Sequence, residues 1–163
     1  MKKIVLASLL LCIAAPAVAE NLYAGVKVGS SSYGLASTTA IGGFVGYHLN
    51  ALDKRLSVEA EYMSLGSTTY FNGTNQSISS FGVSGVYAYP IDQKLSVFGK
   101  AGLNLVSWTY SNPNGNPFWN GSYSSLGINL GAGVDYKITQ KFAVRAGYDT
   151  DTSLLYAAGL VNF

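Results

Sequence analysis

The chain has 163 residues, of which 48% are hydrophobic and 11% are charged. An ordinary soluble domain carries about 25% charged residues, more than twice the share found here. A disordered chain is charged and poor in aromatic residues, so this composition excludes disorder. Beyond the N-terminus, no run of about 18 apolar residues exists, which excludes a helical membrane protein. The length fits one compact domain.

The first segment has the layout of a secretory signal peptide. Lys2 and Lys3 form a basic start, residues 4–15 are apolar, and Ala17–Ala19 is an A-x-A cleavage site. We therefore expect a signal peptide over residues 1–19. An anchor helix is the alternative, but the apolar run is short and is followed by Pro16.

Cleavage after residue 19 would leave one domain, residues 20–163. The only cysteine, Cys12, lies in the removed segment and lacks the preceding small residue of a lipobox. Loss of the two N-terminal lysines leaves eight basic and eight acidic residues. Since no basic field remains, we expect no nucleic-acid partner.

The mature chain alternates between apolar and other side chains in eight segments, and such alternation predicts strands with two different faces. The segments are residues 22–29, 41–49, 56–63, 81–89, 95–105, 126–136, 142–149 and 155–163. All the charged side chains within these segments fall on the face opposite the apolar one: Lys27, Glu59, Glu61, Lys100, Asp135, Arg145 and Asp149.

An even number of strands with an apolar face too large to pack inside a small barrel is typical of a transmembrane β-barrel, which is apolar outside and polar inside. In lipid the sheet must close, because an open edge would leave backbone groups unpaired. The predicted fold class is therefore all-β: an eight-stranded antiparallel up-and-down transmembrane β-barrel.

The connections agree with this fold. Three are short, at residues 50–55, 90–93 and 139–140, whereas residues 30–39, 66–76 and 109–121 form longer connections rich in Ser, Thr, Asn and Gly. Residues 150–152 form a fourth, short connection on the same side as the long ones. Because periplasmic turns are short and outer loops long, we expect both termini in the periplasm.

Aromatic residues mark both ends of the apolar faces, as expected for interfacial girdles. The expected periplasmic girdle contains Tyr47, Tyr87, Tyr89, Tyr136 and Phe163, and the outer one contains Tyr62 and Tyr148.

The strand Gly43–Tyr47 and the ending Leu160–Phe163, together with the signal sequence, resemble small outer-membrane barrels of Gram-negative bacteria. The resemblance is to the OmpA-like transmembrane domain, within the porin family, and to the neisserial surface protein A type. It implies a monomer in the outer membrane, in contact with lipid and lipopolysaccharide. Val161 and Phe163 resemble the terminal signal read by the barrel assembly machinery. OmpA itself continues into a peptidoglycan-binding domain, whereas this chain stops at Phe163, so we expect no such tether.

The charged face would lie inside the barrel, where two interpretations remain open. Three cations balancing four carboxylates form either an ion-pair plug or a gated pore, as proposed for OmpA-like barrels. We favour the plug, because eight strands leave little space for water.

Some small outer-membrane barrels modify lipid A or are proteases, but this chain offers little for catalysis. Its single histidine, His48, is expected beside a short periplasmic turn, away from surface lipid A, and a nucleophile needs a base within reach. Glu59 and Glu61 resemble a paired-acid site only superficially, because nearby cations can neutralise them. We therefore expect no enzyme, no catalytic residues, no cofactor and no metal site.

Phe118 and Trp119, in the loop of residues 111–119, are candidates for contact with a host or surface ligand, or for an extension of the outer girdle. The predicted role is structural or surface interaction, such as adhesion or host contact. A narrow pore is the alternative, and a lipid-modifying enzyme ranks third.

Overall fold

The computed structural model describes residues 21–33, 36–69, 75–111 and 120–163. The expected signal peptide, residues 1–19, and the candidate contact residues Phe118 and Trp119 lie outside the described residues. The described chain forms eight strands: β1 Leu22–Tyr33, β2 Ala36–His48, β3 Leu56–Thr69, β4 Asn75–Pro90, β5 Leu95–Ser111, β6 Gly121–Lys137, β7 Phe142–Asp149 and β8 Leu154–Asn162.

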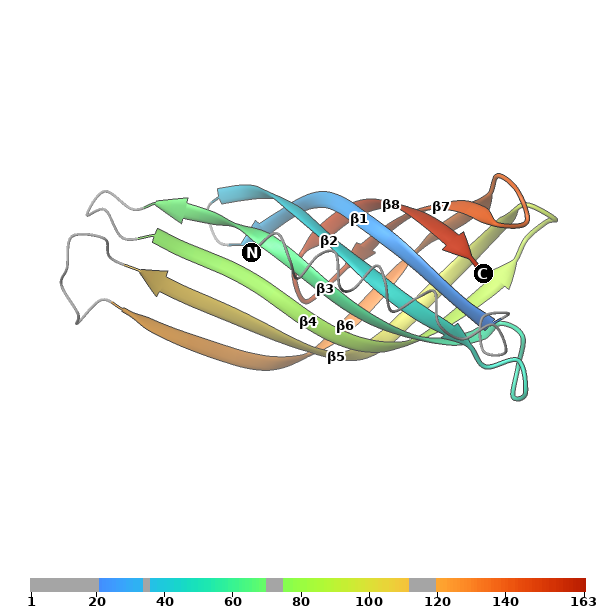
Figure 1. Ribbon diagram of the computed structural model, residues 1–163, viewed down its shortest axis with the longest axis horizontal. Helices are drawn as coiled ribbons and strands as arrows, with labels where there is room; N and C mark the ends of the chain where they lie inside the picture. Colours follow the sequence, from blue (N-terminus) through green and yellow to red (C-terminus); the bar gives the residue numbers. More distant parts are fainter. Residues whose placement is uncertain (1–20, 34–35, 70–74, 112–119) are drawn as a thin grey trace.

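Each strand pairs antiparallel with its neighbours in sequence, and β1 pairs with β8 to close the barrel. Figure 1 shows the tilted strands around a long axis, with residues 49–55, 91–94 and 138–141 at one end. We call this the turn end and the opposite end the loop end. The predicted eight-stranded closed barrel is confirmed.

The alternation of side chains sets the two faces as expected. Apolar side chains on the outside are broadly exposed, among them Ile128 (72%) and Leu130 (52%). The tyrosines expected in the girdles also lie on the outer surface, and Phe163 is exposed. This apolar belt suits a lipid environment.

The interior is filled by pairing large side chains with glycines across neighbouring strands. Tyr23 lies opposite Gly46, and Phe98 lies opposite Gly133. A Cβ added at Gly46 would overlap the Tyr23 ring, and one added at Gly133 would lie 2.8 Å from Phe98 Cε1. The interior glycines therefore make room for the aromatic rings that fill a narrow barrel.

The strands differ in length in a way that the sequence did not predict. β3 to β6 have 14 to 17 residues, whereas β7 has 8 and β8 has 9. Figure 1 shows β3–β6 reaching past the β7–β8 turn at the loop end. The predicted loops at residues 30–39, 66–76 and 109–121 were wrong at their ends, because Ser- and Thr-rich stretches there pair as strands.

We call the loop-end parts of β3–β6 the extension: residues 66–69, 75–79, 107–111 and 121–125. On its outer face the side chains are polar, including Ser77, Ser79, Ser107, Thr109, Ser122 and Ser124. On its inner face lie Ile78, Trp108, Tyr110 and Tyr123. Trp108 of β5 is paired with Ile78 of β4 and with Tyr123 of β6, and Tyr110 lies two residues further along β5. The face pattern of the membrane belt is thus inverted in the extension.

A bulge marks this transition on β3. The register shifts between Ser64 and Gly66, and Gly66 has a φ of 106°, a conformation that glycine adopts without strain. The Thr38 hydroxyl donates a hydrogen bond to the Leu65 carbonyl at 2.5 Å, which ties β2 to the bulge.

Candidate functional site

The seven charged side chains predicted to share one face all lie inside the barrel, on five strands. Four of them form an alternating ring. Lys27 Nζ lies 2.6 Å from Glu61 and 3.1 Å from Asp149, and Lys100 Nζ lies 3.1 Å and 2.9 Å from the same two carboxylates. Both lysines and Asp149 are buried to 4% exposure or less. Each charge in the ring therefore has two opposite neighbours, which offsets its desolvation.

The other three charges centre on Arg145. Its guanidinium lies 2.5 Å from Glu59 and donates two hydrogen bonds to Asp135, at 2.7 Å and 3.1 Å. The Tyr23 hydroxyl donates a further hydrogen bond to Glu59 at 2.7 Å. Charge-assisted hydrogen bonds to both carboxylate oxygens of Asp135 balance its charge and also fix the orientation of the two side chains relative to each other.

Aromatic faces complete the surroundings of the cations. Lys27 Nζ lies 4.0 Å from the centre of the Tyr156 ring, and the Arg145 guanidinium lies 4.4 Å from that of Phe98 and 5.3 Å from that of Phe44. The ring quadrupole attracts a desolvated cation. The rings that fill the barrel thus also stabilise its charges.

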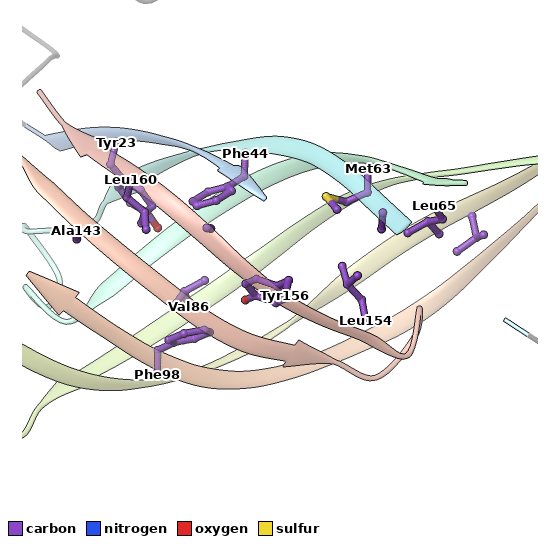
Figure 2. Packing of buried hydrophobic residues seen from close by; sticks show 13 residues of the cluster. Tyr23, Phe44, Met63, Leu65, Val86, Phe98, Ala143, Leu154, Tyr156 and Leu160 are labelled. Atoms are coloured by element: carbon purple, nitrogen blue, oxygen red, sulfur yellow. The ribbon is translucent and has the colours of Figure 1, made fainter. Parts of the chain in front are cut away.

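Apolar layers flank this network along the barrel. The inward residues of β3 run Ser57, Glu59, Glu61, Met63 and Leu65, so that the carboxylates give way to buried apolar side chains towards the loop end. Figure 2 shows Met63, Leu65 and Leu154 gathered at one end of the buried cluster, and Tyr23, Phe44 and Leu160 towards the other. The ring of Lys27, Glu61, Lys100 and Asp149 is enclosed between them, whereas Arg145 and Asp135 lie nearer the turn end.

The mouth at the loop end is bounded on one side by the inner face of the extension. The Trp108 and Tyr123 rings lie 5.6 Å apart at a tilt of 32°, and the Gln76 amide donates to the Tyr110 hydroxyl at 2.8 Å. Trp108 packs partly against the core, whereas Tyr123 is 65% exposed. Sequence reasoning missed this group, because the predicted strands stopped short of Ile78, Trp108 and Tyr123, and Tyr110 was assigned to a loop; the inverted alternation of residues 106–110 was the signal.

The mouth at the turn end opens into a cavity of about 760 Å³. The Arg145–Asp135 pair, Tyr23 and His48 line its inner part, and residues of all three turns line its rim. Sequence reasoning did not predict this vestibule, since turn composition does not reveal the space that turns enclose.

His48 lies at the turn end of β2, as expected, and its ring stacks on Tyr23 with 4.7 Å between the ring centres. Among the described residues, its side chain hydrogen-bonds to Asn162 and to no serine, threonine or cysteine side chain. In the described ranges, no group of three or more His, Cys, Asp or Glu side chains is arranged to hold a metal ion. The same residues include no helix long and apolar enough to cross a membrane.

A closed barrel with an apolar outer belt and a charged interior is the arrangement of a transmembrane β-barrel. Residues 4–160 match the family model of the outer membrane protein beta-barrel domain, and the chain belongs to that family. The comparison with curated proteins finds no match.

Three solved structures share the fold. Neisserial surface protein A is 19% identical, with 87% of this chain and 96% of that chain covered and a TM-score of 0.63. The N-terminal barrel of Pseudomonas aeruginosa OprF is 19% identical, with 86% and 96% covered and a TM-score of 0.59. Ail of Yersinia pestis, in complex with the heparin analogue sucrose octasulfate, is 13% identical, with 86% and 93% covered and a TM-score of 0.57. Identities this low bear on the fold alone.

Proposed function

We propose that this outer-membrane barrel is a surface-interaction protein, anchored by its belt and acting through the inner face of the extension. The observation that carries the proposal is the inverted face pattern of β3–β6. A stretch of strand that only prolonged the barrel into water would need no aromatic face, whereas here Trp108, Tyr110 and Tyr123 line one side of the mouth. Exposed aromatic groups of this kind are typical of contact sites.

The orientation supports this role. Short turns are periplasmic and long connections face outward in such barrels, so we infer that the extension lies on the cell surface and both ends of the described chain in the periplasm. A cleaved signal peptide over residues 1–19, assembly through a terminal signal at Val161 and Phe163, and a monomer in contact with lipopolysaccharide belong to the same proposal. Phe118 and Trp119 would add to the contact surface.

The chemistry of the mouth narrows the kind of partner. In the described part of the loop end, Asp151 is the one charged side chain, and it accepts a hydrogen bond from Asn104 at 2.8 Å. Recognition there would rest on ring stacking and on hydrogen bonds from Gln76 and the hydroxyl groups. Ail is described with a heparin analogue, but the loop end here offers no described lysine or arginine for a polyanion.

An adhesion assay tests the proposal. Cells displaying the protein are exposed to arrayed neutral oligosaccharides, collagen and fibronectin. We expect wild-type cells to bind at least one probe, Tyr123→Ser to lose that binding, and the outer-face variant Thr109→Ala to retain it. Equal binding by Tyr123→Ser, or no binding by wild type to any probe, would contradict a contact role for this face.

A narrow pore is the second candidate, because the vestibule reaches the Arg145 network from the turn end. Planar-bilayer conductance of the refolded mature chain distinguishes the two roles. Silence from both wild type and Arg145→Ala would support a plug. Discrete conductance that changes with the substitution would instead make the ion-pair network a gate. We propose no catalytic role, since His48 stacks on Tyr23 at the end away from the cell surface.

A further inference from the structure

The vestibule at the turn end is a second concave site, at the opposite end of the barrel from the extension. Its volume of about 760 Å³ lies in the range of small-molecule sites, about 300–1,000 Å³. Its inner part ends at Arg145 and Asp135, which bind each other, and its walls include Val86, Ala88 and Leu160. The site is therefore open to the periplasm and closed towards the membrane core.

The rim of this vestibule carries three lysines, two from turns and one from the end of a strand. Lys54 lies in the β2–β3 turn, Lys94 in the β4–β5 turn, and Lys137 at the end of β6, and all three are exposed. Among the described lining residues, Asp135 is the single carboxylate, and Arg145 already holds both of its oxygens. The lining thus has an excess of positive charge.

The two carboxylates in these turns are already engaged. Asp53 forms an ion pair with Arg55 at 2.9 Å, and this hydrogen-bonded contact lowers the pKa of Asp53. The Asp92 carboxylate accepts the backbone N–H groups of Leu95 and Lys94 at 2.6 Å and 2.7 Å, which lowers its pKa in turn. Both therefore remain charged at neutral pH, but neither is among the residues that line the cavity.

We propose that the vestibule binds a soluble multivalent anion from the periplasm, a molecule with three or more carboxylate or phosphate groups. Lysine ammonium groups act as point charges that suit either group, without the bidentate geometry that arginine imposes. Three such charges around one mouth, above a closed floor, match an anion whose charges are spread over several groups. A low-dielectric wall strengthens the attraction by focusing the field.

The position of the three lysines differs from that expected for cations that contact lipid headgroups. Arg55 also lines the cavity, but its guanidinium is paired with Asp53 and lies 5.1 Å over the ring of Tyr87, an exposed residue on the outer surface. Lys141, in the β6–β7 turn, is exposed but does not line the cavity. Lys54, Lys94 and Lys137 line the inside of the mouth, which favours a ligand that enters it.

Calorimetric titration of the protein in phosphatidylcholine nanodiscs tests the proposal, with tripolyphosphate and citrate as the two probes. We expect saturable 1:1 binding of at least one probe, and the stronger of the two identifies phosphate or carboxylate as the preferred group. The combined variant Lys54→Gln, Lys94→Gln and Lys137→Gln should weaken binding by at least about tenfold, because three charges are lost from one mouth. Lys141→Gln is the matched control and should change affinity by less than about twofold, since an exposed charge outside the site is screened.

Three results would overturn the proposal. The first is that neither probe binds saturably. The second is an equal loss of affinity in Lys141→Gln and in the combined variant, because it would mean that the anion is attracted to the basic turn end in general. The third is capture of phosphatidylglycerol from mixed vesicles by wild type and not by the combined variant, without probe binding; the lysines would then serve a lipid contact. All substituted residues are exposed and lie in turns or at the end of a strand, so circular dichroism and the heat-dependent gel shift should match wild type.

Discussion

Within β5, the membrane belt and the extension place opposite chemistry on the same two faces. Leu103 and Leu105 point outward in the belt, and Ser107 and Thr109 point outward four residues further on. Inward, Lys100 and Asn104 give way to Trp108 and Tyr110. The backbone continues in one register throughout, so the difference between the two regions lies in their side chains alone.

The medium outside the barrel accounts for this inversion. In the belt, lipid contacts the outer face, so apolar side chains belong there and charges are enclosed and paired. Past the lipid, water contacts the outer face, and hydroxyl side chains can hydrogen-bond to it. On the inner face, Ile78 and Trp108 pack partly against the core, whereas Tyr123 stays largely exposed. Which face of a strand is apolar thus depends on the medium that the face contacts. Alternation of side chains predicts the orientation of a strand only when that medium is known.

Removal of Arg145 should produce the largest loss of stability, because its guanidinium is paired with two carboxylates inside the barrel. Arg145→Met leaves the buried Glu59 and the half-buried Asp135 without their shared cation, and we expect a cost of about 3–5 kcal/mol in the free energy of unfolding. Urea unfolding in lipid vesicles, followed by gel mobility, measures it. Adding Glu59→Gln and Asp135→Asn should recover much of the loss. A cost below about 1 kcal/mol would indicate a hydrated interior and contradict the enclosed network.

Two arginine substitutions on the outer face of β6 compare the regions directly. Leu130→Arg places a charge in the middle of the belt, where we expect destabilisation by about 2–4 kcal/mol, whereas Ser122→Arg in the extension should cost about 0–1 kcal/mol. The same unfolding experiment measures both. Equal costs would mean that lipid reaches the extension, or that it does not cover Leu130, and would place the boundary elsewhere.

The β3 bulge joins the two regions, so its perturbation should have an intermediate effect. In Gly66→Ala a side chain meets a φ of 106° and the Thr38 Cβ at 2.8 Å. We expect a loss of about 1–3 kcal/mol. Gly121→Ala is the matched control, because an added Cβ there meets nothing within 4 Å. A similar change in both variants would show that the bulge conformation is not specific to glycine.

The sequence was sufficient for the eight strands of the belt, because lipid outside and charge inside give a strict alternation. It also placed all seven charged side chains on the inner face. It was insufficient for the pairing among them: Lys27 meets Glu61 and Asp149, on β3 and β7, and such contacts across the barrel depend on the strand stagger. The extension was missed because the predicted strands ended where apolar side chains leave the outer face, at residue 105, and residues 109–121, rich in Ser, Thr, Asn and Gly, were predicted as a loop.

The smallest effect is expected for an exposed ring of the extension. Tyr123 is 65% exposed and contacts Trp108 from the neighbouring strand. Tyr123→Ser removes one ring pair and little buried area, so the free energy of unfolding should fall by less than about 1 kcal/mol. Because the two ring centres are 5.6 Å apart, the fluorescence of Trp108 should still shift towards that of a more hydrated indole. A loss above about 2 kcal/mol would make the inner face of the extension part of the folding core, as in the belt, and would weaken the argument that its rings are available to a partner.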